Sequence, residues 1–598
     1  MLKTLKDIFG YTEFRPGQEQ PILDLLAGEN VFCVMPTGAG KSLIFQIPAL
    51  MGSGLTIVVS PLIALMNDQV SALKLLGAPA ETLNSSISPE DNEQIWRGVR
   101  TGAVKLLYMS PERLMNGSTL EIMRTLNVTM VAIDEAHCIS QWGPSFRPEY
   151  EMLTELKTHF PGVPIIALTA SADEITRKDI AEKLFGSNVN IYVSGFDRPN
   201  IALGVSPKQS WKNQLAAFVK SRQGDSGIVY CLSRKKCEDA AALLNSLGHK
   251  ALVYHAGMDK FARDDNQKSF VRDPGIIMCA TIAFGMGIDK PDVRFVFHTD
   301  LPSSMENYYQ EFGRAGRDGD RADCEMLFGT GDIRMRRQFI EQDDADAEQK
   351  RRAHKRLDRL IAYCEAPTCR RQALLAYFGE TSKPCNNCDV CLDPVALKEG
   401  TREGQMVLSA MVRTGQRFGP AYICDILVGA DIQRIRDFGH DKLPTWGVGK
   451  HLKKPQWQSI IRQMIASGFV HLDVGEYGGI SMTKTGKDLL RGAVEFSYRP
   501  MSLGKATKIP GRAKTKQAEQ SLSENDMGLL TRLKATRSLL AQKQNVPAFM
   551  IFHDKSLRDM ARQRPQNMAE MANVHGVGKA KLDKFGTVFL ETIKNGNV

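Results

Sequence analysis

The chain has 598 residues, of which 43% are hydrophobic and 24% are charged, and its formal net charge is +10. The composition is that of a globular protein and excludes a mainly disordered, collagenous or coiled-coil chain, and the length predicts about four domains. The modest positive charge permits a polyanionic partner without proving one. Charge interrupts the first residues too early for a secretory segment, and no apolar run reaches the roughly 18 residues that span a membrane. We therefore expect a soluble, cytoplasmic protein with no membrane partner.

Short β-branched runs alternate with helical patterns over the first 332 residues, which is typical of parallel α/β sheets. The runs expected to form strands are 30–35, 55–60, 104–110, 130–134 and 164–169, and then 227–231, 251–255, 276–280, 295–300 and 324–328. The turn-rich sequence 196–200 separates the two sets. We predict two α/β lobes in tandem, over residues 1–200 and 201–332.

Smaller modules are predicted beyond residue 332. Charged helical sequence and a cysteine cluster fill residues 333–400. Mixed helix and hairpin patterns follow over 401–498, where we expect helices at Asp425–Arg436 and Gln456–Ser467 and a turn at Gly475–Gly479.

The last hundred residues divide into a linker and a helical module. Six Lys/Arg face one acidic residue between Arg499 and Glu519 without an apolar period, which predicts a basic flexible linker over 499–522. The pattern leaves open whether this linker only tethers or also contacts phosphates. Apolar residues recur at helical spacing from Leu529 onward, so we expect an all-α module over 523–598.

A glycine-rich sequence, Pro36-Thr37-Gly38-Ala39-Gly40-Lys41-Ser42, follows the first expected strand and precedes a helical run. Such a turn opens backbone N–H groups to phosphates and points a helix N-terminus at them. Thr37, Gly38 and Gly40 would form the cradle, Lys41 would reach the β- and γ-phosphates, and Ser42 would bind Mg²⁺. The usual first glycine of the pattern is Met35 here, and a glycine-rich turn without a ligand is the less favoured alternative.

Two adjacent carboxylates, Asp134 and Glu135, stand at the end of the expected strand 130–134. Ionised carboxylates at the end of a buried strand cost free energy unless a cation such as Mg²⁺ compensates them. Asp134 is the expected magnesium ligand, and Glu135 is expected to orient the attacking water. Alone, this pair would more often be a helix cap, but the phosphate loop on the same predicted sheet favours catalysis.

The second lobe ends in a segment that holds Gln310, Arg314 and Arg317, which we add to the expected catalytic set. Two arginines three residues apart on one helix face, released by a glycine turn, could project across a cleft to a γ-phosphate. A surface ion-pair cluster is the alternative. With the phosphate loop on one lobe and the arginines on the other, ATP would close the cleft and hydrolysis would reopen it.

Four cysteines, Cys369, Cys385, Cys388 and Cys391, crowd into a short stretch. Four thiolates at this spacing fit either tetrahedral Zn²⁺ or an iron–sulfur cluster. Zinc is favoured because the arrangement suits a structural staple and no redox partner is evident.

Five further segments occur in the order and spacing of one known family: 9–18, 60–66, 138–143, 167–170 and 283–288. With the phosphate loop and the Asp134–Glu135 pair they resemble the RecQ family of ATP-dependent DNA helicases in superfamily 2, and the match covers nearly the whole chain. The resemblance implies an α/β fold of two tandem RecA-like parallel-sheet lobes, followed by a zinc-binding module, a winged helix and a small all-α C-terminal domain. It also implies translocation on single-stranded DNA and 3′-to-5′ unwinding of duplex or structured DNA in recombination and repair, with ATP, Mg²⁺ and Zn²⁺.

The resemblance assigns roles at the N-terminus and at the cysteines. Tyr11, Arg15 and Gln18 match a nucleotide-base motif in which the ring stacks on adenine and the amide of Gln18 reads its edge. The four clustered cysteines match the family's zinc ligands, and Cys364 is not among them, so we interpret Cys364 as a buried thiol.

Residues 141–150 match the aromatic-rich loop that couples DNA binding to hydrolysis in the family. Trp142 and Phe146 would stack on bases, each stack contributing about 1–3 kcal/mol, and Arg147 would add charge. From the residues alone, a small buried cluster is equally plausible. Pro144-Ser145 stands where family members usually carry His-Asp, which puts the efficiency of coupling, though not the fold, in question.

The accessory modules resemble a winged helix over about 405–497 and the helicase-and-RNase-D C-terminal domain. The winged helix would grip duplex DNA, although such modules also dock proteins, and a single-stranded-DNA-binding protein is one expected partner. In the last module Phe549 and Lys579 are expected DNA contacts, and Lys581 could also reach a phosphate; a plain helix–helix turn is nearly as well supported. In a bacterium the protein would be associated with the nucleoid.

Two other functions compete with a DNA helicase. One is an RNA helicase or a translocase that never separates strands, which the Asp-Glu-Ala-His sequence and the accessory modules disfavour. The other is a DNA-binding scaffold with a decayed ATPase core, which the intact Lys41, Asp134, Glu135, Arg314 and Arg317 disfavour.

Overall fold

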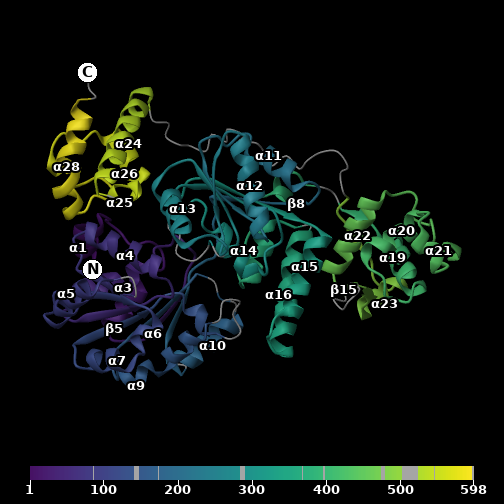
Figure 1. Ribbon diagram of the computed structural model, residues 1–598, viewed down its shortest axis with the longest axis horizontal. Helices are drawn as coiled ribbons and strands as arrows, with labels where there is room; N and C mark the ends of the chain where they lie inside the picture. Colours follow the sequence, from purple (N-terminus) through teal and green to yellow (C-terminus); the bar gives the residue numbers. More distant parts are fainter. Residues whose placement is uncertain are drawn as a thin grey trace.

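The computed structural model describes residues 1–84, 87–140, 147–170, 172, 174–186, 188–282, 284, 290–366, 368–394, 397–472, 479–500, 523–544 and 546–595. Two α/β lobes lie side by side, with a helical region and a small mixed module beyond the second lobe (Figure 1). The last helices return to the other end of the molecule, next to the first lobe and α13, Lys260–Arg272 (Figure 1). Within these residues, no helix is both long and apolar enough to cross a membrane.

The first lobe is a parallel sheet in the strand order β3-β4-β2-β5-β6-β1-β7. The central strands are buried along their whole length except at Thr129 of β5, as expected where helices cover both faces of a parallel sheet. The strands are β1 Val31–Val34, β2 Leu55–Val59, β3 Ala80–Leu83, β4 Leu106–Met109, β5 Val128–Ile133, β6 Ile165–Thr169 and β7 Asn190–Val193.

Thirteen short and long helices accompany this sheet in the described part of the first lobe. Two of them, α3 and η2, begin next to the glycine-rich sequence and next to the Asp134–Glu135 pair. The thirteen helices are α1 Leu2–Thr4, η1 Leu5–Phe9, α2 Glu19–Leu26, α3 Ser42–Met51, α4 Ile63–Leu75, α5 Pro89–Arg100, α6 Pro111–Leu114, α7 Gly117–Arg124, η2 Ala136–Ile139, α8 Pro148–Glu151, η3 Met152–Glu155, α9 Leu156–His159 and α10 Glu174–Phe185.

The second lobe repeats the architecture with a parallel sheet in the order β10-β11-β9-β12-β13-β8. Its strands are β8 Ile201–Pro207, β9 Ser226–Tyr230, β10 Lys250–Tyr254, β11 Ile276–Ala280, β12 Val293–His298 and β13 Ala322–Phe328. Its helices are α11 Trp211–Val219, α12 Arg234–Ser246, α13 Lys260–Arg272 and α14 Met305–Phe312. The predicted pair of tandem parallel-sheet lobes is confirmed.

Three strands of the two lobes were not predicted: β3, β7 and β8. All three are edge strands of their sheets. β3 and β7 are only partly buried, so they lack the continuous apolar run of a central strand. In β8 the apolar run of the sequence is interrupted by Gly204. A Cβ at this position would lie 2.2 Å from Oε2 of Glu325.

The zinc-binding region and the winged-helix region follow the second lobe. The first contains α15 Thr330–Gln342, α16 Ala347–Glu365, α17 Arg370–Tyr377 and α18 Asp389–Leu392. The second contains β14 Lys398–Glu399, α19 Thr401–Arg413, α20 Pro420–Val428, α21 Gln433–Asp437, η4 His440–Lys442, α22 Lys454–Ala466, β15 Val470–Leu472, β16 Ile480–Met482, α23 Lys484–Leu490 and β17 Ser497–Tyr498.

One helix of the winged-helix region was predicted wrongly and another correctly. The expected helix Asp425–Arg436 is two helices, because α20 ends at Val428 and Gly429 adopts a left-handed φ of 68°. The second expected helix is confirmed as α22. The predicted turn Gly475–Gly479 falls between β15 and β16 and lies almost entirely outside the described residues, as does most of the predicted linker 499–522.

The last module is helical, as predicted, and has a hydrophobic core of its own. Its helices are α24 Glu524–Gln544, α25 Ala548–Ile551, α26 Asp554–Gln563, α27 Met568–Met571 and α28 Lys579–Lys594. It contacts the first lobe where the N–H of Gly576 donates to the carbonyl of Gly10 at 2.9 Å. A Cβ on Gly10 would lie 2.4 Å from the Val577 nitrogen, so this approach requires glycine.

Candidate functional site

The phosphate loop connects β1 to α3 and is braced by the residues of the predicted base motif. Gly38 and Gly40 have left-handed φ values of 85° and 80°, which suit glycine. Nη1 of Arg15 donates to the carbonyl of Gly38 at 2.6 Å. The buried amide of Gln18 donates to the carbonyls of Ala39 and Gly40 at 3.1 and 3.0 Å. In this structure the polar groups of the base motif therefore hold the loop itself.

Lys41 lies directly before α3 and faces the two carboxylates at the end of β5. Its Nζ donates to the carbonyls of Met35 and Pro36 at 3.2 and 3.5 Å. Its charge also lowers the pKa of both Asp134 and Glu135. The cation therefore lies against the loop, near enough to the two carboxylates to influence both. Ser42 is the first residue of α3, at the helix N-terminus that the loop presents.

Asp134 and Glu135 follow the buried strand β5, as predicted. The backbone N–H of Asp134 donates to Val59 on β2 at 2.9 Å, and the Tyr150 hydroxyl donates to the Asp134 carbonyl at 3.1 Å. Glu135 has a φ of 50°, a left-handed conformation that is uncommon outside glycine and marks functional sites. The contacts with Val59 and Tyr150 fix the backbone of Asp134 at the end of the strand.

The two carboxyl groups have different environments. Burial and the neighbouring Glu135 raise the pKa of Asp134 to about 6. Burial also raises the pKa of Glu135, but His137, Lys41 and Arg314 outweigh it and lower this pKa to about 2. Asp134 is thus a buried acid whose negative charge is incompletely compensated. A divalent cation would supply the missing charge, so the residues present fit magnesium.

His137 joins these carboxylates to the end of the neighbouring strand β6. Its Nδ1 lies 2.9 Å from Oγ1 of Thr169 and 3.3 Å from Oε2 of Glu135. The imidazole is almost fully buried. The histidine therefore connects two sequence motifs, Asp134–His137 and Ala167–Ala170, that the sequence identified separately.

The arginine segment of the second lobe lies against the phosphate loop of the first. A Cβ on Gly38 would lie 3.7 Å from the Cα of Arg317, and a Cβ on Gly313 would lie 3.7 Å from Oγ1 of Thr37. Arg314 is near enough to Glu135 to lower its pKa. The predicted position on one helix face is wrong, because α14 ends at Phe312 and both arginines lie in the turn that follows. Gln310 remains on α14.

The structure also places the predicted DNA contacts that lie within the described residues. Nη1 of Arg147 donates to the carbonyl of Pro61 at 3.2 Å, so this side chain joins the base of the aromatic-rich loop to the segment before α4. Trp142 and Phe146 lie outside the described residues. Lys579 is exposed at the start of α28, whereas Lys581 is buried over the ring of Phe552 and faces away from solvent.

The four clustered cysteines come together as a set of metal-ligand atoms. Their sulfurs all lie within 4.8 Å of one another, and Sγ of Cys369 and Sγ of Cys388 are 3.9 Å apart. Tetrahedral zinc with bonds of about 2.3 Å places its sulfurs about 3.8 Å apart. Backbone N–H groups of Cys385, Asn387 and Cys391 donate to three of these sulfurs at 3.3 to 3.4 Å, which favours thiolates. The residues fit zinc.

Comparison with known proteins accounts for nearly the whole chain. Family models match as a DEAD/DEAH box helicase over 15–180, a helicase conserved C-terminal domain over 210–319, RecQ zinc-binding over 330–392, an RQC domain over 394–504 and an HRDC domain over 526–593. ATP-dependent DNA helicase RecQ of Haemophilus influenzae is 42% identical over 99% of this chain and 95% of its own length. The chain belongs to the RecQ family. The Bacillus subtilis RecQ is 38% identical over 99% of this chain and 98% of its own length.

The predicted resemblance is thereby confirmed, and this RecQ-family protein is an ATP-dependent DNA helicase. Its zinc-binding region contains the four-cysteine cluster, which favours zinc over the iron–sulfur alternative left open by the spacing. Its RQC and HRDC regions correspond to the predicted winged helix and final helical module.

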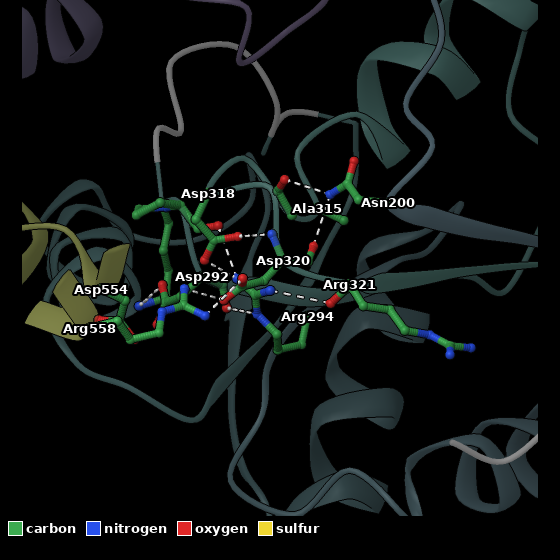
Figure 2. A network of polar contacts seen from close by, with 12 residues as sticks. Asn200, Asp292, Arg294, Ala315, Asp318, Asp320, Arg321, Asp554 and Arg558 are labelled. Carbon is green, nitrogen blue, oxygen red and sulfur yellow. Dashed lines mark hydrogen bonds and ion pairs between the residues drawn. The ribbon is translucent and has the colours of Figure 1, made fainter. Parts of the chain in front are cut away.

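In this RecQ-family helicase the final module contacts both lobes beside the ATP site. The rings of Tyr11 and His575 lie 5.2 Å apart at a tilt of 43°. On the other lobe, Nη1 and Nη2 of Arg558 donate to the two carboxylate oxygens of Asp320 at 3.1 and 2.8 Å, and Figure 2 shows this pair between the two domains. Phe549 lines a cavity between α25 and the second lobe, so this predicted DNA contact lies at a domain interface.

Reversing the charge of Arg558 tests that interface. Arg558→Asp would face Asp320 with a like charge and should detach the last module from the second lobe, which small-angle scattering would record as a larger radius of gyration. The melting temperature should change little, since a half-exposed pair contributes about 1 kcal/mol or less. Arg562→Asp, on the exposed side of the same helix, is the control. Asp320→Arg combined with Arg558→Asp should restore the compact form; no recovery would contradict the assigned pair.

Sequence reasoning missed Arg198 and Arg558, which bridge domains. Arg198 stands in the turn-rich segment between the lobes, a position that could have pointed to a hinge. Arg558 shows no motif, since its partner Asp320 is distant in the sequence and the contact depends on how two domains dock.

Proposed function

We propose that this RecQ-family helicase translocates 3′-to-5′ on single-stranded DNA and unwinds duplex or structured DNA during recombination and repair. The observation that carries the proposal is the meeting of the phosphate loop and the arginine segment, with Gly38 beside Arg317 and Thr37 beside Gly313. A nucleoside triphosphate bound there would contact both lobes. Its hydrolysis would change how the lobes are held together and so drive movement along a strand.

In the proposed ATP site each residue has one task. Thr37, Gly38 and Gly40 cradle the phosphates, Lys41 neutralises the β- and γ-phosphates, and Tyr11, Arg15 and Gln18 bind the base. Magnesium, held by Ser42 and Asp134, would neutralise charge on the phosphate oxygens. Glu135, kept ionised by its cationic neighbours, orients the attacking water, and Gln310, Arg314 and Arg317 act from the second lobe.

Coupling to DNA is proposed to run through His137. Its contacts with Glu135 and Thr169 join the water-orienting carboxylate to the end of β6, and Arg147 joins the aromatic-rich loop to Pro61. The backbone N–H of Arg147 also donates to the carbonyl of Cys138, the residue after His137, at 2.9 Å. Single-stranded DNA bound by Trp142, Phe146 and Arg147 would in this way act on the hydrolytic centre. The winged helix would hold the duplex. As a second role, it would bind a single-stranded-DNA-binding protein. In the last module, Phe549 and Lys579 would contact DNA. In a bacterial cell this places the protein on the nucleoid.

Strand displacement on tailed duplexes tests the polarity. A duplex with a 3′ single-stranded tail should be unwound with ATP and not without it, and the matched duplex with a 5′ tail should stay intact. Equal unwinding of both would contradict the polarity. Faster unwinding of RNA than of DNA duplexes would favour the RNA-helicase alternative.

Trp142→Ala tests the coupling loop. Loss of one base stack removes about 1–3 kcal/mol of DNA contact, so we expect DNA stimulation of ATP hydrolysis to fall about tenfold while the DNA-independent rate stays within twofold. Phosphate release measured with and without single-stranded DNA gives both rates. Equal losses in the two rates would argue for a packing role of Trp142.

A further inference from the structure

Arg198 lies between β7 and β8, in the segment that joins the two lobes. Its Nη1 donates to the carbonyls of Thr37 and Gly313 at 2.8 and 2.9 Å. Its Nη2 donates to the carbonyls of Ala315 and Gly316 at 2.7 and 3.0 Å. Thr37 belongs to the phosphate loop, and the other three carbonyls belong to the segment that carries Arg314 and Arg317. One side chain thus bonds both halves of the ATP site.

The chemistry of these contacts is specific to arginine. A guanidinium presents five N–H donors in a rigid plane and can bond several acceptors that lie apart. The four acceptors here are main-chain oxygens, so the contacts fix the paths of two backbone segments. A lysine ammonium concentrates its donors on one nitrogen and cannot span the same four positions. Burial lowers the pKa of Arg198 to about 10, which leaves the group protonated at neutral pH.

The residues around Arg198 attach the joining segment to the second lobe and the zinc-binding region. The Asn200 side chain donates to the carbonyls of Gly316 and Asp320 at 2.8 and 2.9 Å, and Figure 2 shows Asn200 against the turn that holds Ala315. The Asp197 carboxylate accepts from Arg371 at 2.5 Å. The contacts of Asn200 and Asp197, and three of the four Arg198 bonds, are made with the second lobe or the zinc-binding region. The bond to Thr37 is therefore the one that breaks if the lobes separate.

We propose that Arg198 is a positioning residue for ATP hydrolysis, which holds the phosphate loop and the arginine segment in register when the lobes close. The proposal rests on the roles proposed above for Lys41, Arg314 and Arg317. Arg198 would stay bonded to Gly313, Ala315 and Gly316 throughout the cycle and would bond Thr37 only in the closed state. Closing would thereby place the two arginines at a fixed distance from the triphosphate.

The test compares Arg198→Gln and Arg198→Lys with Arg294→Gln. Arg294 is a matched control, because it also donates to three backbone carbonyls, those of Pro291, Asp292 and Arg321, but all lie in the second lobe (Figure 2). Three quantities are measured on the full chain: kcat with single-stranded DNA, the Kd of a fluorescent non-hydrolysable ATP analogue, and energy transfer between dyes on the two lobes with and without that analogue.

We expect Arg198→Gln to lower kcat about 100-fold, the effect of misplacing reacting groups by about 1 Å, with the analogue Kd changed less than threefold. Analogue-induced energy transfer should be lost. Arg198→Lys should lower kcat at least tenfold, whereas Arg294→Gln should keep the transfer signal even if its Tm falls. Should the glutamine variant fail to fold, the lysine variant carries the same test.

Normal energy transfer and kcat in either Arg198 variant would overturn the proposal. The proposal would also be overturned if an Arg198 variant showed the same fall in Tm as Arg294→Gln and kept normal analogue-induced energy transfer. That pattern would indicate a purely structural role. Failure of the ATP site itself has a different outcome: Arg317→Ala would then hydrolyse ATP at the wild-type rate, whereas the closure signal of the Arg198 variants does not depend on hydrolysis.

Discussion

Replacing Lys41 by alanine is expected to abolish ATP hydrolysis and to leave DNA binding nearly intact. The Lys41 ammonium donates to the carbonyl of Met35 at the phosphate loop, and its charge influences the carboxylates of Asp134 and Glu135. Loss of one such charged donor from a preorganised site costs a factor of about 10²–10³ in kcat. We therefore expect a rate of phosphate release about 100- to 1,000-fold lower.

The control for this substitution is Lys74→Ala. Lys74 lies on α4 of the same lobe and forms a surface ion pair with Glu81 at 2.7 Å, so its loss should leave the rate within twofold. Fluorescence anisotropy of a labelled single strand reports DNA binding for both variants. A Lys41→Ala protein that hydrolyses ATP at the wild-type rate would refute the assigned phosphate site.

Cys388→Ser is expected to release zinc and unfold the zinc-binding region. Cys388 is almost fully buried, its sulfur is 3.9 Å from that of Cys369, and it accepts from the N–H of Cys391. Structural zinc contributes on the order of 10 kcal/mol of folding free energy, far more than ordinary single substitutions cost. The damage should extend to the second lobe, because Leu203 of β8 donates to the Asn387 carbonyl at 3.3 Å.

Metal analysis and thermal unfolding measure the two effects. The wild type should hold one zinc per chain, and the variant should hold much less and melt at a lower temperature. Cys364→Ala is the matched control, because Cys364 is a buried thiol on α16 outside the cluster; it should keep its zinc. Full zinc content in Cys388→Ser would contradict the four-cysteine site.

The two sheets could be predicted from the sequence because their central strands are buried on both faces and therefore appear as continuous apolar runs. The same argument explains why edge strands were missed. Strands β3 and β7 are half exposed at sheet edges, and no apolar run distinguishes them from loops. The break in the helix predicted at Asp425–Arg436 depends on the backbone conformation of Gly429, which helical periodicity does not report.

For the candidate site, sequence reasoning proposed the groups whose side chains would carry the chemistry. Lys41, Asp134 and Glu135 lie in short motifs whose residue types are fixed by phosphate and metal chemistry. The structure added how these groups are connected. Arg198 bonds only backbone carbonyls in the contacts described above, and carbonyls are present at every position, so no residue pattern predicts such partners. His137 and Thr169 are visible as motif residues, but their contact requires the strand order β5-β6.

The last helical module contacts both lobes, the first at Gly10 and the second at Asp320. A module held as one unit cannot follow both lobes if they rotate against each other. Any opening of the cleft must therefore shear one of the two attachments, either the backbone contact at Gly576 or the ion pair of Arg558. The Gly10 contact depends on a close approach of two main chains and tolerates little sliding, whereas a long arginine can track a moving carboxylate over a few ångströms. If the lobes move against each other as proposed, this asymmetry keeps the module with the first lobe.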